Sequence, residues 1–282
     1  MNKKLITIVV TYNAMHWIDR CIGSLRSSSV GTDILVIDNG SSDGTVCHIR
    51  EAFPEVTIME GQGNIGFGAA NNKGLRYALD EGYDFIYLMN QDAWIEPDTF
   101  RLLLDSWQEG FAILSPVQRD SRGNLDRNFS AKCGAFLKGD VAEVPFVMAA
   151  HWMMSRETVE TVGGFSPAFT QYGEDDNYID RLHSFGLKAG VVTAASAVHD
   201  RQDRTLPKDK RMALKCVSAT VHLSNPSYPF FLRCAIEPLR LTGMSLKNLS
   251  VYPVRHIPAL ISRYGELKRY RLQSKEKGAF LP

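Results

Sequence analysis

Two carboxylates each follow an apolar run of the sequence, where a side chain can meet a ligand. Asp38 closes ILVID (34–38) and opens the turn DNGSSDGT. A carboxylate there can accept the imide N–H of a pyrimidine such as uracil or thymine, and we predict this function for Asp38. The alternative is a turn-forming side chain that caps the next helix, but Asp43 is already placed as the N-cap of that helix.

The second carboxylate, Asp92, ends Asn90-Gln91-Asp92, directly after the apolar run FIYLM (85–89). A carboxylate that leaves a buried strand is well placed to hold a hard divalent cation, because one carboxylate together with substrate phosphates is a common arrangement around Mg²⁺. A loop aspartate without a ligand is the structural alternative.

A cluster of carboxylates, Gly173-Glu174-Asp175-Asp176, opens a predicted helix. Three acids in a first turn suit the helix dipole, which is a structural explanation. The functional explanation is a general base at the edge of a substrate crevice. His199 follows a predicted strand and is a further candidate, although a lone histidine is more often structural.

The run Gly61-Gln62-Gly63-Asn64-Ile65-Gly66 matches the dinucleotide-binding fingerprint. It follows the third predicted strand instead of the first, and no acid ends the next strand, so the match to an NAD site is weak. We expect these glycines to let the backbone approach another nucleotide.

The elements that must position these side chains alternate in the first half of the chain. Apolar β-branched runs predict strands, amphipathic segments between them predict helices, and strands apolar throughout predict a parallel sheet covered on both faces. Ligands of such sheets bind beyond the carboxyl ends of the strands, where Thr11, Tyr12 and Asn13 also lie. The strands are expected at 5–10, 34–38, 56–59 and 85–89, and the helices at 16–26, 44–53, 68–80 and 97–110.

The pattern changes after Ile113. Residues 116–145 are polar and irregular, helices are expected from about Ser155 and Glu174, and a strand is expected at 188–192. Beyond residue 200 the chain is predicted to be helical, with prolines separating the helices.

The net charge of +1 is distributed unevenly. Residues 1–200 hold 16 Lys and Arg against 26 Asp and Glu, whereas residues 201–282 hold 16 against 5. An acidic body with a basic tail predicts that the tail meets an anionic partner, such as phosphate, a membrane surface or nucleic acid. A solvated helical face is the alternative.

Composition excludes several classes of protein. With 282 residues, 44% hydrophobic and 22% charged, the sequence is neither disordered nor collagen-like. The five cysteines have no disulfide or zinc-knuckle spacing, which favours a reducing compartment, the cytoplasm. No window of roughly 20 apolar residues predicts a membrane span, and the N-terminal apolar run of about six residues is too short for a signal sequence.

Together these motifs resemble, over about residues 1–200, the family-2 glycosyltransferases with the GT-A fold. The branch that they resemble most is that of bacterial rhamnosyltransferases, which use dTDP-rhamnose to build surface polysaccharide. The resemblance is carried by His199 and by the motifs VVTYN (9–13), VIDNGSSDGT (36–45), GNIGFGAANNKGL (63–75), LMNQDAWI (88–95), VGGF (162–165) and YGEDDNYIDRLHSFG (172–186).

The resemblance implies a role for each candidate residue. Asp175 matches the catalytic base, Asp92 takes the metal-binding place of an Asp-x-Asp motif, and His199 matches a histidine that helps to bind metal or diphosphate. Two residues depart from the family pattern, because Asn90 replaces the first acid of Asp-x-Asp and Asn71 replaces an arginine found in other branches. The substrate-binding residues that it implies are Thr11, Tyr12, Asn13, Asp38, Asn64, Asn90 and Glu174.

The function that we predict is an inverting glycosyltransferase that needs Mg²⁺ or Mn²⁺. Its expected donor is dTDP-L-rhamnose, with a UDP-sugar as the alternative, and its acceptor is a glycan or a lipid-linked glycan. A non-catalytic nucleotide-sugar-binding relative and an NAD-binding oxidoreductase are the weaker alternatives, and nucleic acid is not an expected partner.

The predicted organisation is an α/β GT-A domain, mainly a parallel sheet flanked by helices, followed by a C-terminal helical extension. The GT-A domain would span 1–200, with a nucleotide-binding half at 1–115 and an acceptor-side half at 116–200, and the basic extension would span 201–282. Ile257, Leu260, Ile261, Tyr264 and Leu267 recur there at helical spacing beside cations. Residues 228–272 are therefore expected either to contact the inner face of the cell membrane or to pack on the body.

Overall fold

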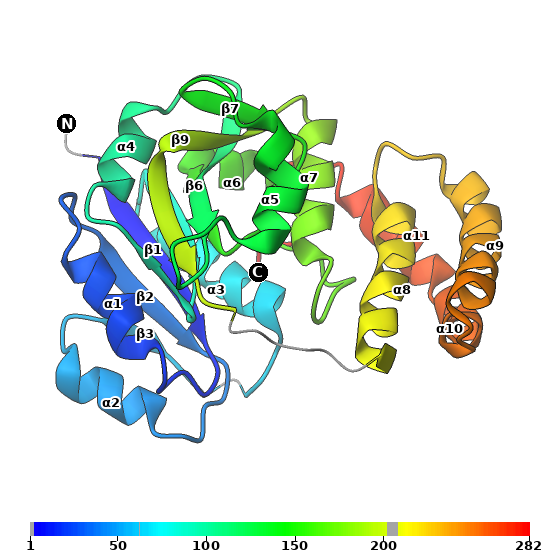
Figure 1. Cartoon of the computed structure of the whole chain (residues 1–282), viewed down its shortest axis with the longest axis horizontal. Helices are drawn as coiled ribbons and strands as arrows, with labels where there is room; N and C mark the ends of the chain where they lie inside the picture. Colours follow the sequence, from blue (N-terminus) through cyan, green and yellow to red (C-terminus); the bar gives the residue numbers. More distant parts are fainter. Residues whose placement is uncertain (1–2, 62, 202–207) are drawn as a thin grey trace.

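The computed structural model describes residues 3–61, 63–201 and 208–282. One mixed β-sheet with helices on both faces forms the body, and helices at the C-terminal end form a second group beside it (Figure 1). This architecture confirms the predicted α/β class with a C-terminal helical region. Gln62 of the glycine run and residues 202–207 of the predicted extension lie outside the described residues.

Nine strands form one sheet within the described residues, in the order β3-β2-β1-β4-β8-β6-β9-β5, with β7 paired to β9. The first four strands in this order are parallel, as predicted, whereas β8 is antiparallel to both β4 and β6. The strands are β1 (Leu5–Thr11), β2 (Asp33–Asp38), β3 (Thr57–Met59), β4 (Phe85–Asn90), β5 (Ala93–Ile95), β6 (Phe111–Arg119), β7 (Val141–Val144), β8 (His151–Ser155) and β9 (Lys188–His199).

Alternate side chains of the strands enter two different cores, one on each face of the sheet. In β1, Ile6 and Ile8 pack in the core under α3, α6 and α7, whereas Leu5 and Val9 pack in the core under α1, α2 and α4. Both faces of the strands are buried, which explains why their sequences are apolar throughout. The helices are α1 (Ile18–Arg26), α2 (Thr45–Ala52), α3 (Phe67–Asp80), α4 (Thr99–Asp105), α5 (Arg127–Cys133), the 3₁₀ helix η1 (Gly134–Phe136), α6 (Arg156–Val162) and α7 (Glu174–Ser184).

Several local predictions are wrong. Residues 116–145 are not irregular, because they hold the end of β6, all of α5 and all of β7. Asp126 caps α5 by accepting the N–H groups of Asn128 and Phe129, a signal hidden in a polar stretch. The N-cap of α2 is Gly44, not Asp43, although the Asp43 carboxylate still accepts the N–H of Thr45 at 3.1 Å.

The C-terminal helices have a small core of their own. Four of the five residues of the predicted amphipathic stripe pack in or against this core, with Leu260 and Leu267 almost completely buried, whereas Ile261 is half exposed. The predicted stripe is therefore mainly a packing surface and not a free apolar face. These helices are α8 (Lys208–Ser224), α9 (Phe230–Asn248), α10 (Tyr252–Ser262) and α11 (Tyr264–Gln273).

The end of the chain returns to the body. Gly164 donates its N–H to Ala279 O at 2.8 Å, and the Asn72 amide donates to Phe280 O at 3.1 Å. A Cβ at Gly163, whose φ is +86°, would lie 1.9 Å from Ala279 O, so only glycine permits this contact. The division of the chain near residue 200 stays a prediction.

No helix among the described residues combines the length and the apolarity that a membrane span requires.

Candidate active site

Hydrogen bonds tie together the carboxyl ends of three neighbouring strands. Thr11, at the end of β1, donates its hydroxyl to Asp38 Oδ1 at 2.9 Å, and the N–H of Tyr12 donates to Gln91 Oε1 at 2.6 Å. Asn13 lies in the left-handed region with φ +52°, and its side-chain oxygen accepts the N–H of Ser42 at 2.8 Å. The sequence-predicted residues of this edge therefore lie together.

Asp38 is buried and organises its own turn. Its Oδ2 accepts the N–H groups of Gly40 and Ser41 at 3.1 and 2.9 Å, and its Oδ1 accepts the hydroxyls of Thr11 and Ser41. These bonds engage both oxygens, so the carboxylate has the turn-forming role that was its structural alternative. Its contact with a pyrimidine base stays a prediction, and a base N–H would have to share or displace one of these donors.

The glycine run is joined to the same turn through two asparagines. The Asn39 amide donates to Asn64 Oδ1 at 3.1 Å, and Asn39 Oδ1 accepts the N–H of Ile65 at 2.8 Å. Gly66 has φ +87°, and a Cβ there would lie 2.5 Å from Thr170 O. Gly66 thus brings the backbone close to the segment that leads into α7, and the exposed Asn64 lies beside the turn that follows Asp38.

The candidate metal residues come together across the β5–β9 ladder, in which Ala93 pairs with His199. His199 Nε2 lies 3.4 Å from Asp92 Oδ1 and 3.3 Å from the Asn90 amide nitrogen. Asp92 and His199 are both buried. Asn90 Oδ1 and His199 Nδ1 are buried without a hydrogen-bond partner among the described residues.

These donors fit a hard divalent cation. Adjacent ligands of an octahedral Mg²⁺ bound at about 2.1 Å lie about 3 Å apart, close to the separation of Asp92 and His199. The orphaned amide oxygen of Asn90 is a further donor of the preferred type. Among the described residues no group of three or more acidic, histidine or cysteine side chains could hold a metal, so substrate phosphates would have to complete the coordination.

The candidate base stands at the first turn of α7. Burial raises the pKa of the Asp175 carboxyl to about 6, and the neighbouring Asp176 carboxylate adds to the shift. Burial also raises the pKa of Glu174 to about 7, with a contribution from Asp175, and Glu174 Oε2 has no hydrogen-bond partner among the described residues. A carboxylate with a pKa of about 6 is ionised at neutral pH and is still basic enough to accept a proton.

A short backbone link joins the base to the metal residues. The N–H of Ala149 donates to the Asp175 carboxylate. The carbonyl of the next residue, Ala150, accepts the N–H of Asn90 at 3.2 Å. The predicted base and the predicted metal ligands therefore belong to the same edge of the sheet.

Two supporting features were missed in the sequence. Tyr87 donates its hydroxyl to His151 Nδ1 at 2.9 Å, and His151 Nε2 donates to Val198 O at 3.0 Å. Burial lowers the pKa of His151 to about 3, so the imidazole is neutral and fixes β9 directly before His199. Asp200 was also missed, and it accepts the Trp17 indole N–H and the Ser121 hydroxyl. The pattern of apolar residues in a sequence predicts that a strand or helix forms. It does not predict which side chains of distant elements meet.

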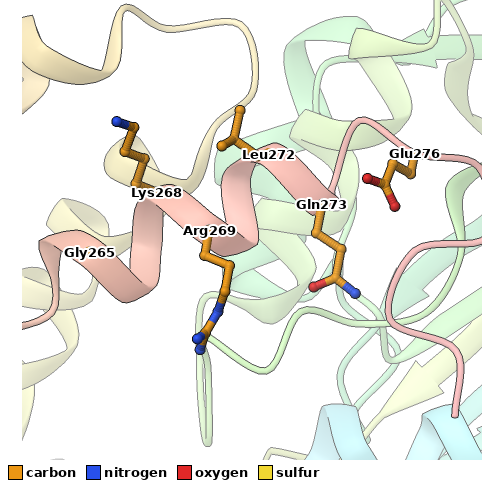
Figure 2. Close-up of a pocket in the computed structure, with 6 residues that line it drawn as sticks. All are labelled: Gly265, Lys268, Arg269, Leu272, Gln273 and Glu276. Atoms are coloured by element: carbon orange, nitrogen blue, oxygen red, sulfur yellow. The ribbon is translucent and has the colours of Figure 1, made fainter.

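Two hollows in the surface of the described residues lie away from these side chains. One of about 540 Å³ lies along α11, where Figure 2 shows the side chains of Lys268 and Arg269 projecting away from one another. Another, of about 210 Å³, is lined by residues such as Asn72, Phe165 and Phe280, where the chain end meets the body.

The sequence model of glycosyl transferase family 2 matches residues 6–163, more than half of the chain, and the chain therefore belongs to this family. A curated relative, the N-acetylglucosaminyl-diphospho-decaprenol L-rhamnosyltransferase of Mycobacterium tuberculosis, is 25% identical over 243 residues, which are 73% of this chain and 78% of the relative. The predicted resemblance is thus confirmed, and the chain is a glycosyltransferase.

Solved structures confirm the GT-A fold. The mannosyltransferase from Pyrobaculum calidifontis, in complex with GDP-Man and Mn²⁺, has a TM-score of 0.57 at 20% identity and covers 97% of this chain and 74% of its own. S. aureus TarS 1–349, in complex with UDP-GlcNAc, has a TM-score of 0.58 at 14% identity. The match covers 97% of this chain and 84% of the TarS chain.

Proposed function

We propose that this glycosyltransferase is an inverting, cation-dependent enzyme that transfers L-rhamnose from dTDP-L-rhamnose to a lipid-linked glycan. The observation that carries the inverting mechanism is the pair of sites at one sheet edge, in which Asp92 and His199 lie 3.4 Å apart and Asp175 is linked to Asn90 through two consecutive residues. The choice of rhamnose is supported by the GFGAANN and NQD segments and by the mycobacterial relative.

In this mechanism Asp175 accepts the proton of an acceptor hydroxyl. The hydroxyl oxygen forms a bond to the anomeric carbon from the face opposite the nucleotide, and the bond from that carbon to the diphosphate oxygen breaks. The electron pair of the broken bond leaves with the nucleoside diphosphate, so the anomeric configuration inverts. Asp92 and His199 would hold a divalent cation, and its chemical contribution when bound is to stabilise the charge that develops on the leaving diphosphate.

The other predicted residues would bind and orient the donor. One hydrogen-bonded edge, beside which the nucleotide base can lie, is formed by Thr11, Tyr12, Asn13 and Asp38. Asn64 lies in the loop before α3, next to this edge. Glu174, buried beside the base, would contact substrate through its orphaned oxygen. The reaction would take place on the inner face of the cell membrane, which soluble nucleotide sugars reach from the cytoplasm.

A transfer assay with a polyprenyl-diphosphate-linked N-acetylglucosamine acceptor tests this proposal. The donors to compare are dTDP-L-rhamnose, UDP-glucose, UDP-N-acetylglucosamine and GDP-mannose, each with Mn²⁺. We expect turnover with dTDP-L-rhamnose to exceed that with every other donor and to give a product of inverted configuration. Preferred use of GDP-mannose, or a product with retained configuration, would contradict it, and preferred use of a UDP-sugar would replace rhamnose by the alternative donor.

A further inference from the structure

The solvent-facing side of α9 is almost free of charge. Phe231, Leu239 and Leu246 are each more than 70% exposed, although such side chains normally face a core. Only Lys247, in the last turn, adds a charge to the exposed positions. The exposed uncharged residues are Phe231, Leu232, Ala235, Ile236, Leu239, Thr242, Gly243 and Leu246.

The other charges of α9 turn inward instead. Glu237 is completely buried and accepts hydrogen bonds from Arg240 Nε at 2.6 Å and from His222 Nδ1 of α8 at 2.8 Å. Burial opposes ionisation of Glu237, but the bonds from His222 and Arg240 outweigh it and lower the pKa. A surface helix normally has the opposite arrangement, with its polar side chains outward. The inner side of α9 is apolar as well, because Leu241 is completely buried in the core of the C-terminal helices. A helix that is apolar on both sides is normally covered on both, which indicates that the outward side of α9 has an apolar neighbour.

The turn after α9 and the start of α10 continue this surface. Leu249 is 90% exposed in the left-handed region with φ +47°, and Val251 and Val254 are also exposed. Figure 1 shows α9 and α10 together at the end of the molecule remote from the sheet. A continuous apolar surface of this kind marks a contact with a protein or a membrane.

The charges around this surface favour an anionic bilayer. Between residues 228 and 262 the sequence has one carboxylate, the buried Glu237. The exposed rim is cationic, with Lys247 and Arg255 exposed and Lys268 Nζ of α11 lying 5.1 Å from the ring centroid of Phe231. Figure 2 shows Lys268 projecting from α11 on the side opposite Arg269. A symmetric contact with a second copy would bring these cations together without carboxylates to pair them.

We propose that the outward side of α9 and the α9–α10 turn insert into the surface of an anionic bilayer, with α9 lying in the membrane plane. Apolar side chains would enter the acyl boundary while Lys247, Arg255 and Lys268 meet anionic headgroups. This proposal extends the function proposed above and rests on it for the lipid-linked acceptor. An enzyme bound to the bilayer would meet that acceptor in the same leaflet.

Flotation of the full-length chain with vesicles tests the proposal without donor or acceptor. The vesicles are equal parts of phosphatidylglycerol and phosphatidylcholine, compared with phosphatidylcholine alone. We expect binding to the anionic vesicles that weakens with salt, and the double variant Leu239→Gln/Leu246→Gln should bind at least about tenfold more weakly. The matched control is Phe136→Gln, which changes an exposed aromatic of the body and should bind as the wild type does.

The cationic rim has its own variant, Lys247→Gln/Arg255→Gln. It should lose most of the preference for anionic over neutral vesicles and most of the salt dependence. Circular dichroism confirms that the variants fold, which we expect because the substituted side chains are exposed.

Three results would overturn the bilayer proposal. They are wild-type protein that does not float with anionic vesicles, a Leu239→Gln/Leu246→Gln variant that floats as the wild type does, and a wild-type dimer in solution that this variant converts to a monomer. The last result would assign the surface to a second copy. Because no sugar is transferred in the flotation assay, failure of the transferase proposal would leave its result unaffected.

Discussion

His199 Nε2 lies 3.4 Å from Asp92 Oδ1, and both side chains are buried at the end of the β5–β9 ladder. In the proposed site, this histidine and this carboxylate would supply two of the ligands of a small cation, and substrate phosphates would supply others. The neutral His151, bonded to Val198 O, supports β9 directly before His199.

Substitution of His199 by Gln should weaken the binding of the cation more than it lowers the stability of the fold. We expect the half-saturating Mn²⁺ concentration for turnover to rise by at least about tenfold, the loss that follows even from removal of an outer-shell partner of a metal ligand. The control is His183→Gln, on the exposed side of α7, which should leave the Mn²⁺ dependence unchanged. An unchanged Mn²⁺ dependence in His199→Gln would assign the histidine a structural role.

The pH dependence of turnover should report the ionisation of Asp175. Its pKa of about 6 predicts that kcat/KM rises as the pH increases through about 6, because only the ionised carboxylate can accept the acceptor proton. Asp175→Asn should lose at least about 10²-fold in kcat with donor affinity nearly unchanged. If donor affinity collapses while turnover at saturation persists, Asp175 is a binding residue.

The two possible roles of Asp38 can be separated with Thr11. Asp38→Asn removes a charged acceptor from the N–H groups of Gly40 and Ser41 and should cost about 1–2 kcal/mol of stability. Thr11→Val removes one donor to the carboxylate but leaves the carboxylate in place. If Asp38 also contacts the pyrimidine base of the nucleotide, Asp38→Asn should weaken dTDP binding at least about tenfold. Thr11→Val should weaken it much less. Equal effects in calorimetry would restrict Asp38 to its turn.

Glu174 should make the folded protein less stable as the pH rises. Its folded-state pKa of about 7 lies above the ordinary value of 4.5, so the folded state holds a proton that the unfolded state has released, and stability falls between about pH 4.5 and 7. The side chain of Glu174→Gln is neutral at every pH. The free energy of unfolding of this variant should exceed that of the wild type by up to about 3 kcal/mol near pH 8 and by almost nothing near pH 4.5.

Thermal unfolding at the two pH values measures this difference. Glu109→Gln, an exposed substitution in the turn before β6, should change the Tm at neither pH. A Tm gain for Glu174→Gln that is the same at both pH values would show that packing causes it, not the removal of a charge.

Local sequence signals predicted the edge formed by β1, β2 and β4. In each strand an apolar run ends at a polar residue, Thr11, Asp38 or Asn90, and parallel pairing brings such ends together. The approach of Asp92 to His199 was not predictable from local sequence, because β5 has three residues and its partner is distant in the chain. The resemblance to a family supplied that pairing.

The outward side of α9 was not predictable for a different reason. Helical periodicity shows that a helix has an apolar side, but not whether that side meets a core. The stripe that includes Leu260 and Leu267 meets one, whereas Leu239 and Leu246 remain exposed, because α9 packs on the core through another side, which includes the buried Leu241.

The central claim is that Asp92 holds a divalent cation needed for sugar transfer. Its most direct test is the rate of transfer by the wild type and by Asp92→Asn, each with Mn²⁺ and with excess EDTA. We predict that the wild type is inactive in EDTA and recovers when Mn²⁺ is restored, and that Asp92→Asn keeps its fold but is inactive in both conditions. Wild-type rates in Asp92→Asn, or full wild-type activity in excess EDTA, would contradict the claim.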